Sequence, residues 1–162
     1  MIKLVRVDHR LIHGQVAYAW TKQLGVNCIL VANDAVAADK LRMAALRMAA
    51  PSGVKVVIKS IKDSAEALLS GKTDPYQLMI ILESIRDAER LTSEVPAVRS
   101  VNLGGVKKED GKRQISMAVS VSDEECALLR KMHDANVELF VQMVPEDRRQ
   151  DAIALIKEKE NG

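Results

Sequence analysis

The chain has 162 residues, of which 48% are hydrophobic and 28% are charged, the composition of one globular domain. Only 2% of the residues are aromatic, which argues against binding of single-stranded nucleic acid by base stacking. The 24 basic and 22 acidic residues leave a net charge of +2, and no basic run is dense enough to indicate contact with a nucleic-acid backbone.

Short β-branched runs alternate along the chain with longer segments of helical periodicity, a pattern typical of a parallel sheet with helices on both faces. A polar stretch containing Asp110-Gly111 precedes the sixth of these runs, so we expect that run to be an antiparallel strand near one edge. The predicted strands, in chain order, are residues 2–7, 27–31, 54–58, 77–82, 98–102, 115–121 and 137–141.

Apolar residues recur at helical spacing between these strands, first in residues 16–24 and then in residues 41–49, where Pro51-Ser52-Gly53 ends the helix. Further helices are predicted at residues 62–69, 84–92, 123–134 and 146–159. We therefore predict a single α/β domain over residues 1–162. Its expected fold is an open, twisted, doubly wound sheet of about seven mostly parallel strands, one antiparallel near an edge, with helices on both faces.

The cysteines and the N-terminus indicate where such a protein works. Cys28 lies inside an apolar run and Cys126 in a predicted helix, so we expect two buried thiols in a reducing compartment. The first six residues carry charge and form too short an apolar segment for a signal peptide or a membrane anchor. The expected location is the cytoplasm, and a partner would have to bring the protein to a membrane.

The loop after the first predicted strand concentrates Arg6, Asp8, Arg10 and His13 just before Gly14, where a helix should begin. A helix N-terminus attracts anions through its free backbone N–H groups and the positive end of its dipole. Gly14 leaves room for a bulky anion, Arg10 can hold phosphate oxygens in a fork, and Arg6 adds a second fixed charge. These features predict a phosphate-binding site.

His13 beside such a site could act as a ligand-binding donor, as a general acid or base, or as a nucleophile that takes the phosphoryl group. The last role requires one free ring nitrogen, while Asp8 or a backbone carbonyl could hold the other. No metal is expected, because two histidines and an aspartate on a tight loop lack the spacing of a zinc site. His9 is expected on an exposed loop and His133 at a solvated helix end.

Residues 6–16 read Arg-Val-Asp-His-Arg-Leu-Ile-His-Gly-Gln-Val. This stretch resembles the Arg-Ile-Asp-x-Arg-Leu-Ile-His-Gly-Gln-Val motif of IIB subunits in the mannose/fructose/sorbose family of the bacterial sugar phosphotransferase system. The family usually has an acidic or other small polar residue at the position of His9, so the resemblance assigns His9 no role. The likeness continues through Trp20-Thr21 and residues 33–39, 50–54, 101–105 and 118–121.

The resemblance implies a phosphohistidine carrier, a protein-histidine:sugar phosphotransferase. His13 would accept a phosphoryl group from the IIA component and pass it to a sugar at the membrane components IIC and IID. Asp8 would orient the histidine or balance its charge, and neither a cofactor nor a metal is implied. The chain would work in the cytoplasm at the inner face of the membrane, and family members can be homodimers. The phosphate-binding residues that the motif implies are Arg6, Arg10, Gly14 and Gln15.

Two other functions remain open on the sequence. A histidine phosphatase or mutase also has a His-Gly pair after a strand, but it places Arg directly before the histidine, where this chain has Ile12. The second alternative is a non-enzymatic anion-binding module, although Gly104-Gly105 alone is a weak signal for a nucleotide-binding loop. For a carrier that meets two partners we expect a shallow, exposed site with Leu11 and Ile12 as its apolar rim.

Overall fold

A seven-stranded sheet forms the centre of the computed structural model, which describes residues 1–162. In space the strand order is β3-β2-β4-β1-β5-β8-β9, and every neighbouring pair is parallel except β8 and β9. The predicted open, mostly parallel sheet is confirmed. Its strands are β1 (Ile2–Asp8), β2 (Cys28–Ala32), β3 (Lys55–Lys59), β4 (Leu78–Leu82), β5 (Ser100–Gly105), β8 (Glu138–Val141) and β9 (Gln150–Asp151).

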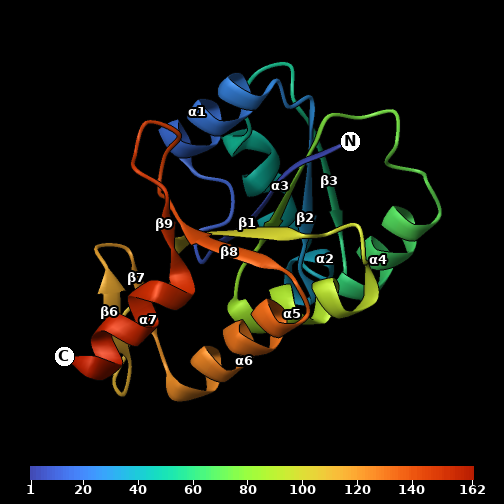
Figure 1. Ribbon diagram of the computed structural model, residues 1–162. Helices are drawn as coiled ribbons and strands as arrows, with labels where there is room; N and C mark the ends of the chain where they lie inside the picture. Colours follow the sequence, from blue (N-terminus) through green and yellow to red (C-terminus); the bar gives the residue numbers. More distant parts are fainter.

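Helices cover both faces of this sheet (Figure 1). One face carries α1 (Gly14–Leu24), α2 (Asp34–Ala37) and α3 (Lys40–Ala49) over a cluster of 12 buried apolar residues. The other carries α4 (Ile61–Leu69), α5 (Ile85–Glu94), α6 (Asp123–Asp134) and α7 (Ala152–Asn161) over a cluster of 30. Strands β2 and β4 are buried at every residue, as expected where a parallel sheet is covered on both sides.

The predicted strand at residues 115–121 is wrong in detail. Met117 and Ala118 form a turn that divides it into β6 (Arg113–Ser116) and β7 (Val119–Val121), an antiparallel hairpin outside the main sheet. The antiparallel strand at the sheet edge is instead β9, two residues long.

The helix predicted at residues 146–159 begins only at Ala152. The two residues before it pair with β8, and the Asp151 side chain then accepts a hydrogen bond from the Ala154 N–H, which starts α7. Both cysteines are free and buried, as predicted. No helix of the structure has the length and apolar character needed to span a bilayer.

Candidate functional site

The central strand β1 brings two charged side chains to the carboxyl edge of the sheet. Arg6 and Asp8 both point toward the α1 side, because alternate side chains of a strand share a face, while Val5 and Val7 pack into the larger core opposite. Arg6 is 1% exposed and Asp8 0%. The sequence thus places a charged pair inside the molecule, directly before the loop that carries His13.

The Arg6 guanidinium is enclosed by acceptors from distant parts of the chain. Its Nη1 donates to Asn102 Oδ1 at 2.7 Å and to the Gln142 carbonyl at 3.2 Å, and its Nη2 donates to Asp8 Oδ2 at 3.0 Å. Gly104 makes room for it, since a Cβ there would lie 2.0 Å from Arg6 Cζ. Burial lowers the pKa of Arg6, and the charge and hydrogen bond of Asp8 oppose that shift.

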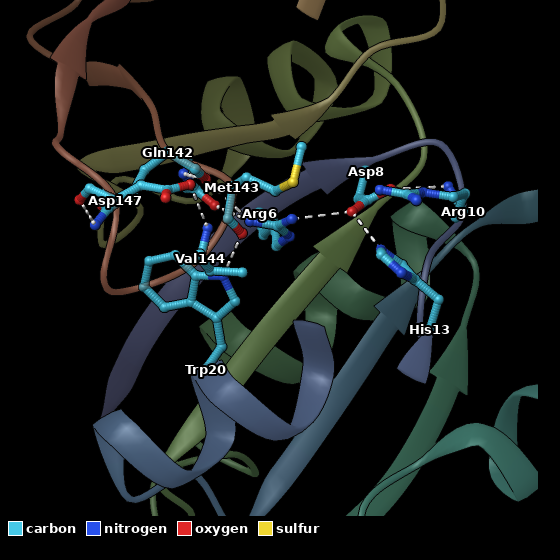
Figure 2. Close-up of polar contacts among 10 residues, drawn as sticks. Arg6, Asp8, Arg10, His13, Trp20, Gln142, Met143, Val144 and Asp147 are labelled. Carbon is cyan, nitrogen blue, oxygen red and sulfur yellow. Dashed lines mark hydrogen bonds and ion pairs between the residues drawn. The ribbon is translucent and has the colours of Figure 1, made fainter. Parts of the chain in front are cut away.

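Asp8 is the centre of the site, and its two oxygens face different partners (Figure 2). Besides Arg6, Oδ2 contacts His13 Nε2 at 2.7 Å, while Oδ1 accepts the Arg10 N–H at 3.0 Å and lies 3.5 Å from Arg10 Nε. Burial alone would raise the pKa of Asp8. Hydrogen bonds from His13 and from the Arg10 N–H, together with the Arg6 charge, outweigh burial and hold that pKa below its ordinary value.

This carboxylate determines how the His13 ring is held. An ionised Asp8 can only accept hydrogen bonds, so His13 Nε2 carries the proton that they share. The Nδ1 atom has no hydrogen-bond partner in the protein, and the side chain is 22% exposed. The arrangement leaves Nδ1 without a protein partner on a partly exposed side chain, the condition that phosphoryl transfer through this ring would require.

The loop between β1 and α1 is anchored by apolar side chains. Leu11 donates its N–H to the Asp8 carbonyl at 2.9 Å and has a φ of 58°, a left-handed conformation that is uncommon for leucine. Leu11 and Ile12 are only 4% and 3% exposed, packed into the smaller core. The expectation that these two residues form an exposed rim for partners is therefore wrong. Their side chains instead anchor the loop to the smaller core.

His13 is also the N-cap residue of α1; its backbone is extended, and its side chain accepts no hydrogen bond from the first turn of the helix. The N–H groups of Gly14, Gln15 and Val16 find no acceptor in the protein, and Gly14 and Gln15 are exposed. Gly14 has a φ of +37°, which glycine adopts without strain. The helix therefore presents its positive end beside the His13 ring.

The sequence-predicted residues occupy two layers around Asp8. His13, Arg10, Gly14 and Gln15 lie on the outer side, with the Arg10 side chain 47% exposed. Arg6 lies on the inner side, as Figure 2 shows, and its donors are directed at protein acceptors. The direct contact between Arg6 and a bound phosphate that its position in the sequence predicted does not fit this burial.

Three residues that complete the inner layer were not predicted as site residues from the sequence: Asn102, Gly104 and Gln142. A signal for one of them existed, because a polar Asn102 inside a predicted buried strand needs a buried partner. His9 is exposed and its N–H donates to Gly105, and His133 is exposed in the last turn of α6, as expected. No group of three or more His, Cys, Asp or Glu residues is arranged to hold a metal.

Comparison with known proteins finds relatives that match nearly the whole chain. The family model described as "PTS system sorbose subfamily IIB component" matches residues 2–162. The sorbose-specific EIIB component of Lacticaseibacillus casei is 32% identical over 158 residues, covering 98% of this chain and 96% of that protein. The mannose-specific EIIAB component of Escherichia coli K12 is 35% identical over 156 residues, covering 96% of this chain but 48% of that longer protein.

Solved structures agree with the sequence relatives. The IIBSor domain of the sorbose permease from Klebsiella pneumoniae superposes with a TM-score of 0.92 at 28% identity, covering 98% of this chain and 97% of that one. The N-acetylgalactosamine-specific IIB component 1 from Escherichia coli has a TM-score of 0.87 at 30% identity, with coverage of 93% and 99%.

Proposed function

This chain belongs to the sorbose subfamily of phosphotransferase-system IIB components, and on that premise we propose that it carries a phosphoryl group on His13. In this function it accepts the group from a IIA component and transfers it to a sugar at the membrane components IIC and IID, in the cytoplasm at the inner face of the membrane. The observation that carries the proposal is the His13 imidazole, held at Nε2 by Asp8 with Nδ1 free beside the α1 N-terminus.

The chemistry follows from which nitrogen is free. His13 Nδ1 attacks the phosphorus of a phosphohistidine on IIA; the Nδ1–P bond forms as the donor N–P bond breaks, and the donor imidazole leaves with the electron pair. The His13 ring, substituted at Nδ1 and protonated at Nε2, then carries a positive charge. Ionised Asp8, at 2.7 Å from Nε2, balances that charge and keeps the ring oriented for in-line transfer.

The second transfer reverses the role of the ring. A sugar hydroxyl attacks the phosphorus as the Nδ1–P bond breaks; the bonding pair returns to Nδ1, which restores the neutral imidazole, and the hydroxyl proton passes to solvent. The unpaired N–H groups of Gly14 and Gln15 and the Arg10 guanidinium are placed to neutralise phosphoryl oxygens in both steps. Arg6 acts on the reaction through Asp8, whose Oδ2 it holds from the inner side.

The test of the carrier is phosphorylation from phosphoenolpyruvate through the general phosphotransferase components and IIA. We expect one acid-labile phosphoryl group per chain, attached at Nδ1 by NMR of the labelled protein, and none in His13→Ala. The variants His9→Ala and His133→Ala should label like the wild type. Labelling that survives in His13→Ala would remove the carrier role, and hydrolysis of phosphate esters by the protein alone would favour a phosphatase.

Arg10 provides a second test of the same site. Because its side chain is exposed and pairs only with Asp8, Arg10→Ala should fold normally yet accept and donate the phosphoryl group about 10- to 100-fold more slowly, the effect of one charge-assisted hydrogen bond. Arg86→Ala, on the outer surface of α5, is the matched control and should not change the rate. Unchanged transfer in Arg10→Ala would make Arg10 a surface residue without a part in the reaction.

A further inference from the structure

Asn102 is a completely buried polar residue of β5 that lies directly beside Arg6 in the register of the two parallel strands. Its neighbours Val101 and Leu103 pack into the larger core, so the Asn102 side chain points to the α1 side, as Arg6 does. Burial of an amide is unfavourable unless its atoms are hydrogen-bonded. The hydrogen bonds of this amide do not reach His13, so an effect of Asn102 on the reaction has to pass through Arg6.

The partners of Asn102 fix the orientation of its amide. Arg6 can only donate, so the atom that lies 2.7 Å from Arg6 Nη1 is the amide oxygen. The amide nitrogen then donates to the Gln142 carbonyl at 3.0 Å, and the same carbonyl accepts from Arg6 Nη1 at 3.2 Å. Asn102 is therefore one acceptor for Arg6 and also holds the second acceptor in place.

These two acceptors use both hydrogens of Arg6 Nη1, and Arg6 contacts Asp8 through Nη2 alone, at 3.0 Å from Oδ2. An arginine beside a carboxylate otherwise favours a fork of two parallel N–H···O bonds. A fork on Asp8 would engage both of its oxygens. Both already have partners on the outer side, since Oδ1 accepts the Arg10 N–H and Oδ2 contacts His13 Nε2.

The Arg6 guanidinium is also confined by its apolar surroundings. Its Cζ lies 5.8 Å from the centre of the Trp20 ring, and a Cβ at Gly104 would lie only 2.0 Å from the same atom. The group therefore has little room to leave the inner layer. The acceptors at Nη1 decide how it faces Asp8.

From this geometry we propose that Asn102 is a positioning residue, which limits Arg6 to one hydrogen bond with Asp8 and so keeps the Asp8 carboxylate turned toward His13. The consequence for phosphoryl transfer rests on the proposed carrier function. The position of the carboxylate does not, so the two proposals can fail separately.

The Nε2–H proton of His13 reports on that position, and NMR of protein labelled with ¹⁵N-histidine detects it at about pH 8, where an ordinary histidine is neutral. In the wild type the hydrogen bond to Asp8 should shift this resonance downfield, and its absence in His13→Ala assigns it. Asn102→Leu removes both amide contacts and frees Arg6 to form the fork. The resonance should then move upfield or be lost by exchange with water, and an unchanged resonance would overturn the proposal.

Val101→Ala is the matched control for lost packing. Val101 precedes Asn102 in the same strand and is completely buried, but its side chain faces the larger core. This variant should be less stable than the wild type without a change in the His13 resonance. A change equal to that in Asn102→Leu would mean that Asn102 acts only through general packing, which contradicts a positioning role. Circular dichroism would verify that each variant folds.

Asn102→Asp is a second variant, which keeps an oxygen acceptor for Arg6 Nη1 whether the new carboxyl group is protonated or ionised. Arg6 then has no reason to form the fork, so the His13 resonance should stay at its wild-type position or move further downfield. An upfield move equal to that in Asn102→Leu would show that the acceptor is not what matters and would overturn the proposal.

The effect on phosphoryl transfer is read from the rate of phosphorylation by phosphorylated IIA. In Asn102→Leu we expect kcat to fall about tenfold or more, the effect of one hydrogen bond to a charged group. The KM for phosphorylated IIA should not change, because Asn102 is buried. Asn102→Asp should lose less, and Val101→Ala should match the wild type. An unchanged kcat in Asn102→Leu would overturn the positioning role, whereas labelling that survives in His13→Ala would overturn the carrier function and leave the NMR test intact.

Discussion

Arg6 and Asp8 stand two residues apart in one strand, and both are almost completely withdrawn from water. Removing two charges from solvent costs several kcal/mol per ion, which such a pair regains only where every donor and acceptor is satisfied. Asn102 and the Gln142 carbonyl supply the remaining acceptors for Arg6, and Gly104 supplies the space. As a result, the Asp8 carboxylate cannot rotate away from His13.

Asp8→Asn tests this dependence. The substitution leaves the Arg6 charge buried without its counterion, so the free energy of unfolding should fall by about 3 kcal/mol or more, measured by urea denaturation. Asp123→Asn removes a carboxylate of a pair in which that side chain is 95% exposed, and should cost less than about 1 kcal/mol. Equal losses in the two variants would mean that the Arg6–Asp8 pair is no more than a surface ion pair in energy.

At the scale of elements, the helix beginning at the site differs from the other six. The side chains of Asn33, Asp39, Ser60, Ser84, Ser122 and Asp151 accept backbone N–H groups at the starts of α2 to α7. The N-cap of α1, His13, accepts none. Because its first N–H groups have no protein acceptor, a phosphoryl group on His13 would act as the missing cap of α1.

Two serine substitutions, expected to change the free energy of unfolding in opposite directions, test how these helices are stabilised. Ser122→Ala removes half of the capping box that Ser122 and Glu125 form at the start of α6, and should lower the free energy of unfolding by about 1 kcal/mol. Ser64→Ala, inside α4, removes a buried hydroxyl that has no hydrogen-bond partner and should raise it by about 0.5 to 1 kcal/mol. Urea denaturation of both measures the signs, and destabilisation by Ser64→Ala would indicate a partner for that hydroxyl.

The inner strands could be predicted from the sequence because each is a continuous apolar run that two helix layers bury. The hairpin β6–β7 could not, since its turn at Met117 and Ala118 contains none of the residues that usually mark turns. Strand β9 is too short to carry a pattern. Its pairing depends on β8, which lies beside it only in the folded molecule.

The site likewise combines residues that are close together in the sequence with residues that are far apart in it. Asp8, Arg10 and His13 are neighbours in the chain, so their residue types and spacing already indicated a phosphate site. Asn102 and Gln142 meet Arg6 across 96 and 136 positions, and only the order of strands β1, β5 and β8 brings them together. For the same reason the sequence predicted that Arg6 contacts the phosphate, whereas the fold places it on the inner side of Asp8.

At the scale of the whole molecule, the site depends on the smaller of the two cores. Leu11 and Ile12 anchor the His13 loop among 12 buried residues, while the 30-residue core on the opposite face lies under α4 to α7. The charged inner layer thus lies on the face of the sheet that has the smaller core. Because the pKa of Asp8 in this layer is lowered in the folded chain, its protonation should be visible in the stability of the whole fold.

Acid titration of stability tests this last expectation. An aspartate in the unfolded chain has a pKa of about 3.9, and the pKa of folded Asp8 lies lower, so the unfolded state binds the proton first as the pH falls. The stabilisation from Asp8 is complete above the unfolded pKa and is lost as the pH falls through the lower, folded value. Asp87 has the opposite sign, because burial raises its pKa, so acidification first favours its folded form.

Urea denaturation between about pH 7 and about pH 3 should therefore show a wild type that loses stability below about pH 4. In Asp8→Asn the loss should be smaller, since the depressed carboxyl no longer titrates, although the variant begins from a lower stability. In Asp87→Asn the loss should be larger, because the compensating group is gone. A pH dependence in Asp8→Asn identical to that of the wild type would mean that this carboxyl titrates alike in the folded and unfolded chains, against the buried network that surrounds it.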